Sequence, residues 1–222
     1  MQTTKYYHVI IALFSVCLVV SNIIAVKIGS FLGYFLPVAV ILFPFTYILG
    51  DVLTEVYGYA AARRAIWTGF FCNLVAVIAI WLSIKIVPAP FFANQPAFAA
   101  ILGFTPRLLV ASFLAYLVGQ FANSYILSKL KIRTQGKHLW ARTVGSTVVG
   151  EGLDSLVFIV LAFSGVLPSV AIPTLVLTQW IFKSAFEVVA TPFTYIVVNY
   201  LKQAEGLDVY DHQTNFNPVK IN

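Results

Sequence analysis

The residues of this sequence that could do chemistry are charged side chains inside long apolar stretches. They are Asp51, Glu55, Glu151, Asp154, Lys183 and Glu187. A charged side chain at the centre of a lipid bilayer costs roughly 2.5–3.5 kcal/mol on the insertion scale. These groups are therefore expected to face a protein interior or a water-filled cavity, where each can find a partner.

Most of these residues belong to rows with a spacing of four, which puts the members of a row on one face of a helix. The rows are Tyr47–Asp51–Glu55, Ser146–Gly150–Asp154, Gln179–Lys183–Glu187–Thr191 and Ala111–Ala115–Gly119–Asn123, with further amides at Asn22, Asn73 and Gln120. Together they predict a polar interior of carboxylates, one ammonium and several amides. Such an interior suits a cation or a small ligand that mainly donates hydrogen bonds.

Structural roles stay open for the same residues. The alternatives are helix packing for the row 111–123, an interfacial ion-pair cluster for Asp51, Glu55, Arg63 and Arg64, a salt bridge within one helix for Lys183 and Glu187, and interhelical hydrogen bonds for Asn22 and Asn73. That all of them are structural at once is disfavoured, because ion pairs are a costly structural device in lipid.

The composition sets the class of protein. Of the 222 residues, 60% are apolar and 10% are charged, with a mean hydropathy of +0.89. A soluble domain has about 45–50% apolar and 25% charged residues. Soluble, disordered and fibrous classes are therefore excluded, and the sequence predicts an all-α integral membrane protein.

Six apolar segments are long enough to cross a bilayer, which takes about 20 residues. They are Tyr6–Ile28, Gly33–Val56, Ala65–Val87, Arg107–Lys129, Arg142–Phe163 and Ala171–Tyr200. We expect one domain over residues 1–222, with a long outer loop from Pro88 to Pro106 that caps the interface. The polar tail at 203–222 is expected to be a cytoplasmic strap or a disordered end.

The basic residues predict the orientation. Of the 14 lysines and arginines, only Lys27, Lys85 and Arg107 fall at the outer ends of these spans, and Lys183 lies within one. This bias puts both termini in the cytoplasm. It also accounts for the net charge of +6, so nucleic acid is not an expected partner; the lipid bilayer is.

The sequence lacks the motifs of common enzymes and metal sites. HExxH, CxxC, GxSxG, GxGxxG and Walker patterns are all missing from it, so we expect no metal, no cofactor and no catalysis. An aspartyl intramembrane protease would need Asp51 and Asp154 to meet. Asp51 falls too near the cytoplasmic end of its span for that.

Several blocks resemble one family over nearly the whole chain. They are SNIIAVKIG (Ser21–Gly29), FPFTYILGDVLTEVYGYAAARRAIW (Phe43–Trp67), VGQFANSYILSKLK (Val118–Lys131), HLWARTVGSTVVGEGLDSLVFIVLAFSGVLP (His138–Pro168) and FKSAFEVVATPFTYIVVNYLK (Phe182–Lys202), followed by DVYD and FNP. They resemble the queuosine precursor transporters, which belong to the vitamin uptake transporter group of bacterial inner-membrane proteins.

The resemblance implies a multi-pass protein of the bacterial inner membrane that imports 7-deazapurines for salvage into a modified tRNA base. The expected substrates are 7-cyano-7-deazaguanine and 7-aminomethyl-7-deazaguanine, bound in a polar cavity at the membrane midplane. The alternative is a substrate-capturing membrane subunit of an ATP-driven vitamin-type importer. A homodimer and proton coupling are left open.

The positions that match the family motif are Asn22, Lys27, Asp51, Glu55, Arg63, Gln120, Asn123, Arg142, Asp154, Lys183 and Glu187. We expect Asp154 and Glu187 to take the guanine-like edge and Lys183 to orient Glu187. The other expected substrate-binding residues are Asn22, Asn73, Gln120, Asn123, Glu151, Gln179 and Tyr47. Asp51, Glu55 and Arg63 are expected to form a gate or an ion-coupling group.

Overall fold

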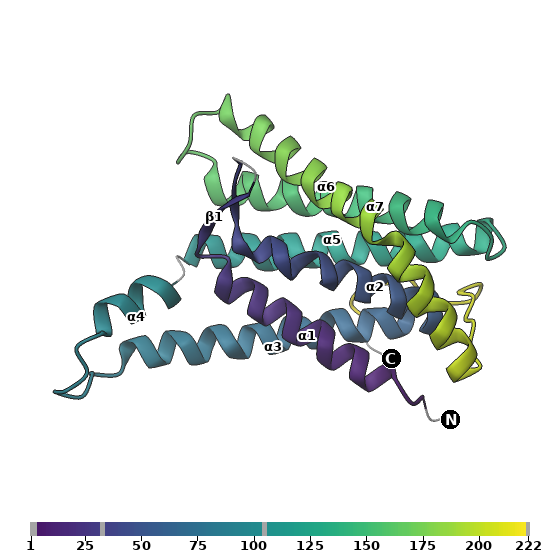
Figure 1. Cartoon of the computed structure of the whole chain (residues 1–222), viewed down its shortest axis with the longest axis horizontal. Helices are drawn as coiled ribbons and strands as arrows, with labels where there is room; N and C mark the ends of the chain where they lie inside the picture. The colour runs from purple at the N-terminus through teal and green to yellow at the C-terminus, as the bar shows by residue number, and fades with distance from the viewer. Residues whose placement is uncertain (1–3, 32–33, 104–105, 221–222) are drawn as a thin grey trace.

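Helices account for most of this chain in its computed structural model, which describes residues 4–31, 34–103 and 106–220 (Figure 1). In chain order the elements are α1 (Tyr7–Ile24), β1 (Ile28–Phe31), β2 (Tyr34–Pro37), the 3-10 helix η1 (Val38–Ile41), α2 (Phe43–Tyr57), α3 (Tyr59–Lys85), α4 (Gln95–Leu102), α5 (Pro106–Arg133), α6 (Leu139–Phe163) and α7 (Ala171–Glu205). The prediction of an all-helical membrane protein is confirmed at this level.

Five stretches are long and apolar enough to cross a membrane, and they contain α1, α3, α5, α6 and α7. The span expected at Gly33–Val56 is wrong as a single helix. Its first part forms β2 and η1, and only α2 is helical, with 15 residues or about 22 Å at 1.5 Å per residue. Pro37 and Pro44 explain the difference, because proline cannot continue a helix or a central strand through its interior.

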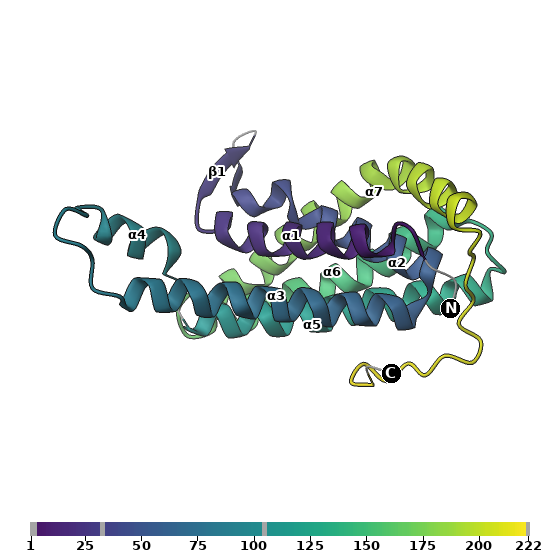
Figure 2. The same cartoon turned by 90° about the horizontal axis from the view of Figure 1, so that it is seen from below.

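Helix α2 lies inside the bundle rather than at its rim. It packs against α1, α3, α5 and α7, and nearly every residue from Thr46 to Tyr57 is buried. Figure 2 shows the long helices running side by side around it. The row Tyr47–Asp51–Glu55 is therefore enclosed by protein on all sides, which is why the chain can keep two carboxylates there.

Helices α5 and α6 make the closest crossing of the fold. A Cβ atom added to Gly119 would lie 3.0 Å from the Gly150 carbonyl oxygen, and one added to Gly150 would lie 2.9 Å from the Gly119 carbonyl oxygen. Ala111 and Ala115 of the same small-residue row are also buried. This row therefore serves helix packing, as the first alternative predicted.

The two ends of the bundle differ. The β1–β2 hairpin, in which Ile28 pairs with Pro37, and α4 both lie toward one end of the bundle, apart from each other (Figures 1 and 2). Helix α1 begins and α7 ends at the opposite end. Sidedness in the membrane stays a prediction.

The polar tail is ordered and crosses the second end of the bundle; we call residues 206–220 the strap. Asp211 accepts hydrogen bonds from the Tyr59 backbone N–H at 2.9 Å and from the Ser128 hydroxyl at 2.7 Å. Arg63 donates to the backbone oxygens of Asn215 and Asn217, both at 2.8 Å. These contacts tie the strap to α3 and α5.

Candidate functional site

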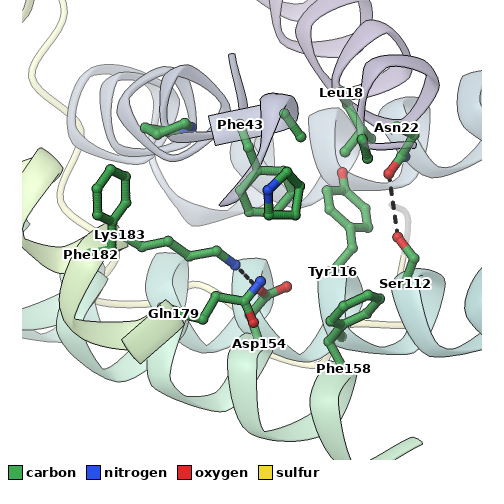
Figure 3. Close-up of a pocket in the computed structure, with 15 residues that line it drawn as sticks. Leu18, Asn22, Phe43, Ser112, Tyr116, Asp154, Phe158, Gln179, Phe182 and Lys183 are labelled. Carbon is green, nitrogen blue, oxygen red and sulfur yellow. Dashed lines mark hydrogen bonds and ion pairs between the residues drawn. The ribbon is translucent and has the colours of Figure 1, made fainter. Parts of the chain in front are cut away.

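A cavity of about 130 Å³ opens between α1, η1 and helices α2, α5, α6 and α7 (Figure 3). It is lined by Leu18, Asn22, Ala25, Pro37, Ala39, Phe43, Pro44, Ser112, Ala115, Tyr116, Asp154, Phe158, Gln179, Phe182 and Lys183. One buried water needs roughly 10–15 Å³ of such volume, so the space admits a small organic ligand. The cavity lies on the hairpin side of the bundle's middle, since it takes its residues from the end of α1 and the starts of α2, α5 and α7.

The charged groups of the cavity are an ion pair between two helices. Lys183 Nζ on α7 donates to Asp154 Oδ2 on α6 at 2.5 Å, and the ammonium also lies 4.4 Å from the centre of the Phe43 ring. The expected pairing of Lys183 with Glu187 is wrong. Both candidates are within reach of a lysine side chain, but Asp154 faces it across the α6–α7 contact (Figure 3).

Uncharged polar groups and aromatic rings complete the cavity wall. The Ser112 hydroxyl donates to Asn22 Oδ1 at 3.4 Å, and Gln179 Oε1 is buried without a hydrogen-bond partner in the described part of the chain. The aromatic residues are Phe43, Tyr116, Phe158 and Phe182. One carboxylate, amide groups and flat apolar walls suit a planar heterocycle that presents hydrogen-bond donors.

The structure thus brings four of the expected substrate-binding residues into the cavity. They are Asn22, Asp154, Gln179 and Lys183. The other six, Tyr47, Asn73, Gln120, Asn123, Glu151 and Glu187, are buried but do not line the cavity. Sequence reasoning missed Ser112, Phe158 and Phe182, which nothing in the pattern separates from other apolar-face residues. Phe43 and Pro44 were not predicted as cavity residues either, although they are the first two residues of one sequence block that carries the family resemblance.

Three carboxyl groups, Asp51, Glu151 and Glu187, form what we call the acid cluster. Each is at most 1% exposed, and Asp51 interacts electrostatically with both glutamates. Asn123 Nδ2 donates to Asp51 Oδ1 at 2.7 Å. The Ser184 hydroxyl lies 3.4 Å from Glu151 Oε2, whereas neither oxygen of Glu187 has a partner among the described residues.

Glu55 is the centre of a second charged group, the Glu55 network, which also contains Lys131, Arg142, Lys202 and Asp208. Glu55 Oε1 lies 2.7 Å from Arg142 Nη2, 2.7 Å from Lys202 Nζ and 3.6 Å from Lys131 Nζ. Asp208 of the strap lies 2.6 Å from Lys131 and 2.8 Å from Lys202. Burial raises the pKa of Asp208, but its hydrogen bonds to the two ammonium groups outweigh this and hold the pKa below its usual value.

Asp51, Glu55 and Arg63, the expected gate or ion-coupling group, make their hydrogen bonds and ion pairs with different partners, although Asp51 and Glu55 interact electrostatically; their role as a gate stays a prediction. Asp51 belongs to the acid cluster, Glu55 binds cations from α5, α6 and α7, and Arg63 holds the strap. The partners of Glu55 could not be predicted from the sequence, because they come from helices whose register against α2 no local spacing specifies.

The order of these groups is the same on three helices. From the hairpin end, α2 presents Phe43, Asp51 and Glu55; α7 presents Lys183, Glu187 and Lys202; and α6, which runs in the opposite direction, presents Asp154, Glu151 and Arg142. The acid cluster thus lies between the cavity and the Glu55 network. The described residues include no group of three His, Cys, Asp or Glu that could hold a metal ion.

Comparisons with known proteins find a transporter family and relatives that are named transporters. Residues 37–197 match the family described as "Putative vitamin uptake transporter". A Bacillus subtilis (strain 168) protein named "Probable queuosine precursor transporter" is 29% identical over 178 residues, which cover 80% of this chain and 78% of that protein. The Escherichia coli (strain K12) "Queuosine precursor transporter" is 27% identical over 167 residues, covering 73% of this chain and 72% of that protein. No solved structure gives a significant match.

The match to the family covers well over half of the chain, from the end of β2 to the last turns of α7. It includes the Asp154–Lys183 pair of the cavity and the whole acid cluster. The chain therefore belongs to the vitamin uptake transporter family, which is a family of transporters and not of enzymes.

Proposed function

We propose that this protein carries queuosine precursors, namely 7-cyano-7-deazaguanine and 7-aminomethyl-7-deazaguanine, across the bacterial inner membrane, with the cavity as their binding site. The names of the relatives support the substrate class. The chemistry of the cavity supports it independently, because Phe43, Tyr116, Phe158 and Phe182 offer aromatic rings against which a flat heterocycle can stack.

The Asp154 carboxylate is the observation that carries the proposal. Among the described residues it is the only acid that lines the cavity, and its Oδ2 atom is held by Lys183 at 2.5 Å. The guanine-like edge of a 7-deazaguanine presents a ring N–H and an exocyclic amine. A carboxylate accepts both in a bidentate pair, so the ligand competes with Lys183 for Asp154.

The amides and aromatic rings give the rest of the recognition. The carbonyl oxygen of Gln179 has no hydrogen-bond partner among the described residues. The NH₂ group of the same side chain can donate a hydrogen bond to the carbonyl oxygen of the heterocycle. Phe158 and Phe182 offer ring faces on the side of α6 and α7. Stacking and hydrogen bonds together would select a planar base over an aliphatic vitamin.

In this proposal, the Glu55 network and the strap block the route of the substrate at the end of the bundle opposite the hairpin. If the basic residues mark the cytoplasmic side, the cavity in this conformation belongs to the outer half of the protein. Release inside the cell would then require the contacts of Glu55 with α5, α6 and α7 to open.

Exchange in proteoliposomes tests the proposal. Purified protein is reconstituted alone with unlabelled 7-cyano-7-deazaguanine inside, and entry of the labelled compound is followed, with guanine alongside. We expect saturable exchange. Asp154→Asn should weaken substrate affinity by about 1–3 kcal/mol, as the loss of a buried polar partner does.

Glu205→Gln is the matched control, since it makes a carboxyl-to-amide change on α7 far from the cavity. It should exchange substrate like the unmodified protein. Saturable binding without exchange would instead support the substrate-capturing subunit that needs an ATP-driven partner. Exchange of thiamin or biotin and not of the deazapurine would overturn the proposed substrate.

A further inference from the structure

Glu187 is a buried carboxyl group that the proposed substrate site does not use. It is 1% exposed, and both of its oxygens are without a hydrogen-bond partner among the described residues. An ionised carboxylate in such a place needs a cation or strong hydrogen-bond donors. The structure therefore raises the question of what neutralises it.

The helices that pack against this part of α7 are α6 and α2. Besides Glu187, the ionisable groups that α2, α6 and α7 bury are Tyr47, Asp51, Glu55, Tyr57, Arg142, Glu151, Asp154 and Lys183, and Lys202 of α7 is partly buried. Every cation of this set is already bound to another acid. Arg142 and Lys202 hold Glu55, and Lys183 holds Asp154, so within the described part of the chain no ammonium or guanidinium group forms an ion pair with the acid cluster.

Three neighbouring carboxyl groups in a low-dielectric interior cannot all be ionised without a cation. Of the three, Asp51 is the carboxyl group that we expect to be ionised, because the Asn123 amide donates to it at 2.7 Å and the Thr147 hydroxyl lies 3.5 Å from it. Neither oxygen of Glu187 has a hydrogen-bond partner among the described residues, and a buried carboxyl group without partners is neutralised most simply by binding a proton.

We propose that the acid cluster is a proton-binding site, with Glu187 as the group that holds the proton, and that binding of substrate in the cavity releases this proton. The inference rests on the proposed function only for the identity of the substrate. Its structural basis is the isolation of Glu187 and the position of Lys183.

Lys183 links the two sites. It lies one turn before Glu187 on the same face of α7, it is bound to Asp154 in the cavity, and it interacts electrostatically with Glu151. When the donor edge of a substrate takes Asp154, the ammonium of Lys183 is free to pair with Glu187. The Glu187 carboxyl group then gives up its proton to solvent and becomes the carboxylate partner of Lys183, so that the complex with a neutral substrate carries one negative charge more than the free protein.

Proton release on binding is the direct test. Unbuffered, purified protein with a pH-indicator dye is mixed with saturating 7-cyano-7-deazaguanine, a neutral compound that carries no titrating amine. We expect the release of up to one proton per bound substrate. By linkage, the dissociation constant should fall as the pH rises, by at most tenfold per pH unit.

Two variants locate the proton. Glu187→Gln should bind substrate but release at most half as much acid, and its affinity should depend less on pH. Lys183→Gln should likewise release at most half as much acid, because no ammonium group can then replace the proton on Glu187. Glu205→Gln is the matched control on the same helix and should release as much as the unmodified protein.

The outcomes separate this inference from the proposed function. Absence of deazapurine binding at any pH would contradict the function. Binding without proton release, release that Glu187→Gln leaves unchanged, or an affinity that follows the Na⁺ concentration instead of the pH would each overturn the proton site.

Discussion

The cavity and the Glu55 network are both charged, buried and built from the same helices, yet they differ in how many opposite charges surround their central carboxylate; the second oxygen of Glu55 still has no hydrogen-bond partner among the described residues. In the network, one carboxylate oxygen receives three cations and the strap adds a second acid. In the cavity a single ion pair stands among aromatic rings, and Gln179 keeps an unpartnered carbonyl oxygen. The acid cluster beside it includes the unpartnered Glu187.

This difference separates stability from function. A buried charge that is paired with several opposite charges holds helices in place, and removing one partner is costly. A buried polar group that lacks a partner costs free energy in the folded protein; next to the cavity we assign Gln179 to the ligand and Glu187 to a proton. Substitutions at the two places should therefore change different measurements.

Glu55→Gln should have the largest effect on stability. It leaves Arg142 and Lys131, at 1% and 2% exposed, without their buried carboxylate. Breaking a buried pair from one side costs about 3–5 kcal/mol. We expect a strongly lowered thermal unfolding midpoint in detergent, measured by intrinsic fluorescence.

Lys202→Met provides the matched comparison, because Lys202 binds the same Glu55 oxygen but its side chain is 20% exposed. Its loss should lower the midpoint much less than Glu55→Gln does. Equal effects of the two substitutions would mean that burial does not determine the strength of this network.

Gly119→Ala should have an intermediate effect. The added methyl carbon would lie 2.5 Å from the Tyr47 hydroxyl oxygen, 2.8 Å from Asp154 Cβ and 3.0 Å from the Gly150 carbonyl oxygen. Overpacking of this kind costs about 1–3 kcal/mol. Because Asp154 is one of the three neighbours, substrate affinity should fall together with the unfolding midpoint.

Gly145→Ala is the control for this change, since its added methyl carbon meets only Leu130 Cδ1 at 3.7 Å. Within a helix, alanine is favoured over glycine by roughly 0.5–1 kcal/mol, so this variant should be unchanged or more stable. A Gly119→Ala protein as stable as Gly145→Ala would contradict the close α5–α6 crossing.

Spacing predicted the inward faces well and the pairs across them poorly. The rows of four put Asp154, Gln179 and Lys183 toward the interior, and the cavity contains all three. The partner of Lys183 was not predictable in the same way. An i,i+4 neighbour is fixed by helix geometry, whereas the approach of Asp154 depends on how α6 crosses α7.

Hydropathy had a similar limit for the segment 33–56. Its apolar composition satisfied the criterion for a span, but two prolines divide it into β2, η1 and the short buried α2. The aromatic residues of the cavity wall could not be predicted from the sequence either. With 15% of all residues aromatic, nothing marked Phe158 or Phe182 before the helices were packed.

Asp208→Asn should have the smallest effect on the unfolding midpoint, and this effect should depend on pH. Asp208 belongs to the strap, and its pKa is held below the usual value by Lys131 and Lys202 despite burial. A lowered carboxyl pKa adds stability above the unfolded pKa of about 3.9 and loses it as the pH falls through the folded value. The side chain is 44% exposed, so this contribution should stay below about 1 kcal/mol.

The measurement is the unfolding midpoint of both proteins between pH 7 and pH 3. The unmodified protein should lose the advantage it has over Asp208→Asn at neutral pH as the pH falls below 4, so that the two curves converge. High salt should also reduce the difference, because an exposed pair is screened and the buried contacts of Glu55 are not. Curves that stay parallel down to pH 3 would mean that Asp208 contributes no charge-dependent stability. The stability of the Glu55 network would then not depend on the carboxylate of the strap.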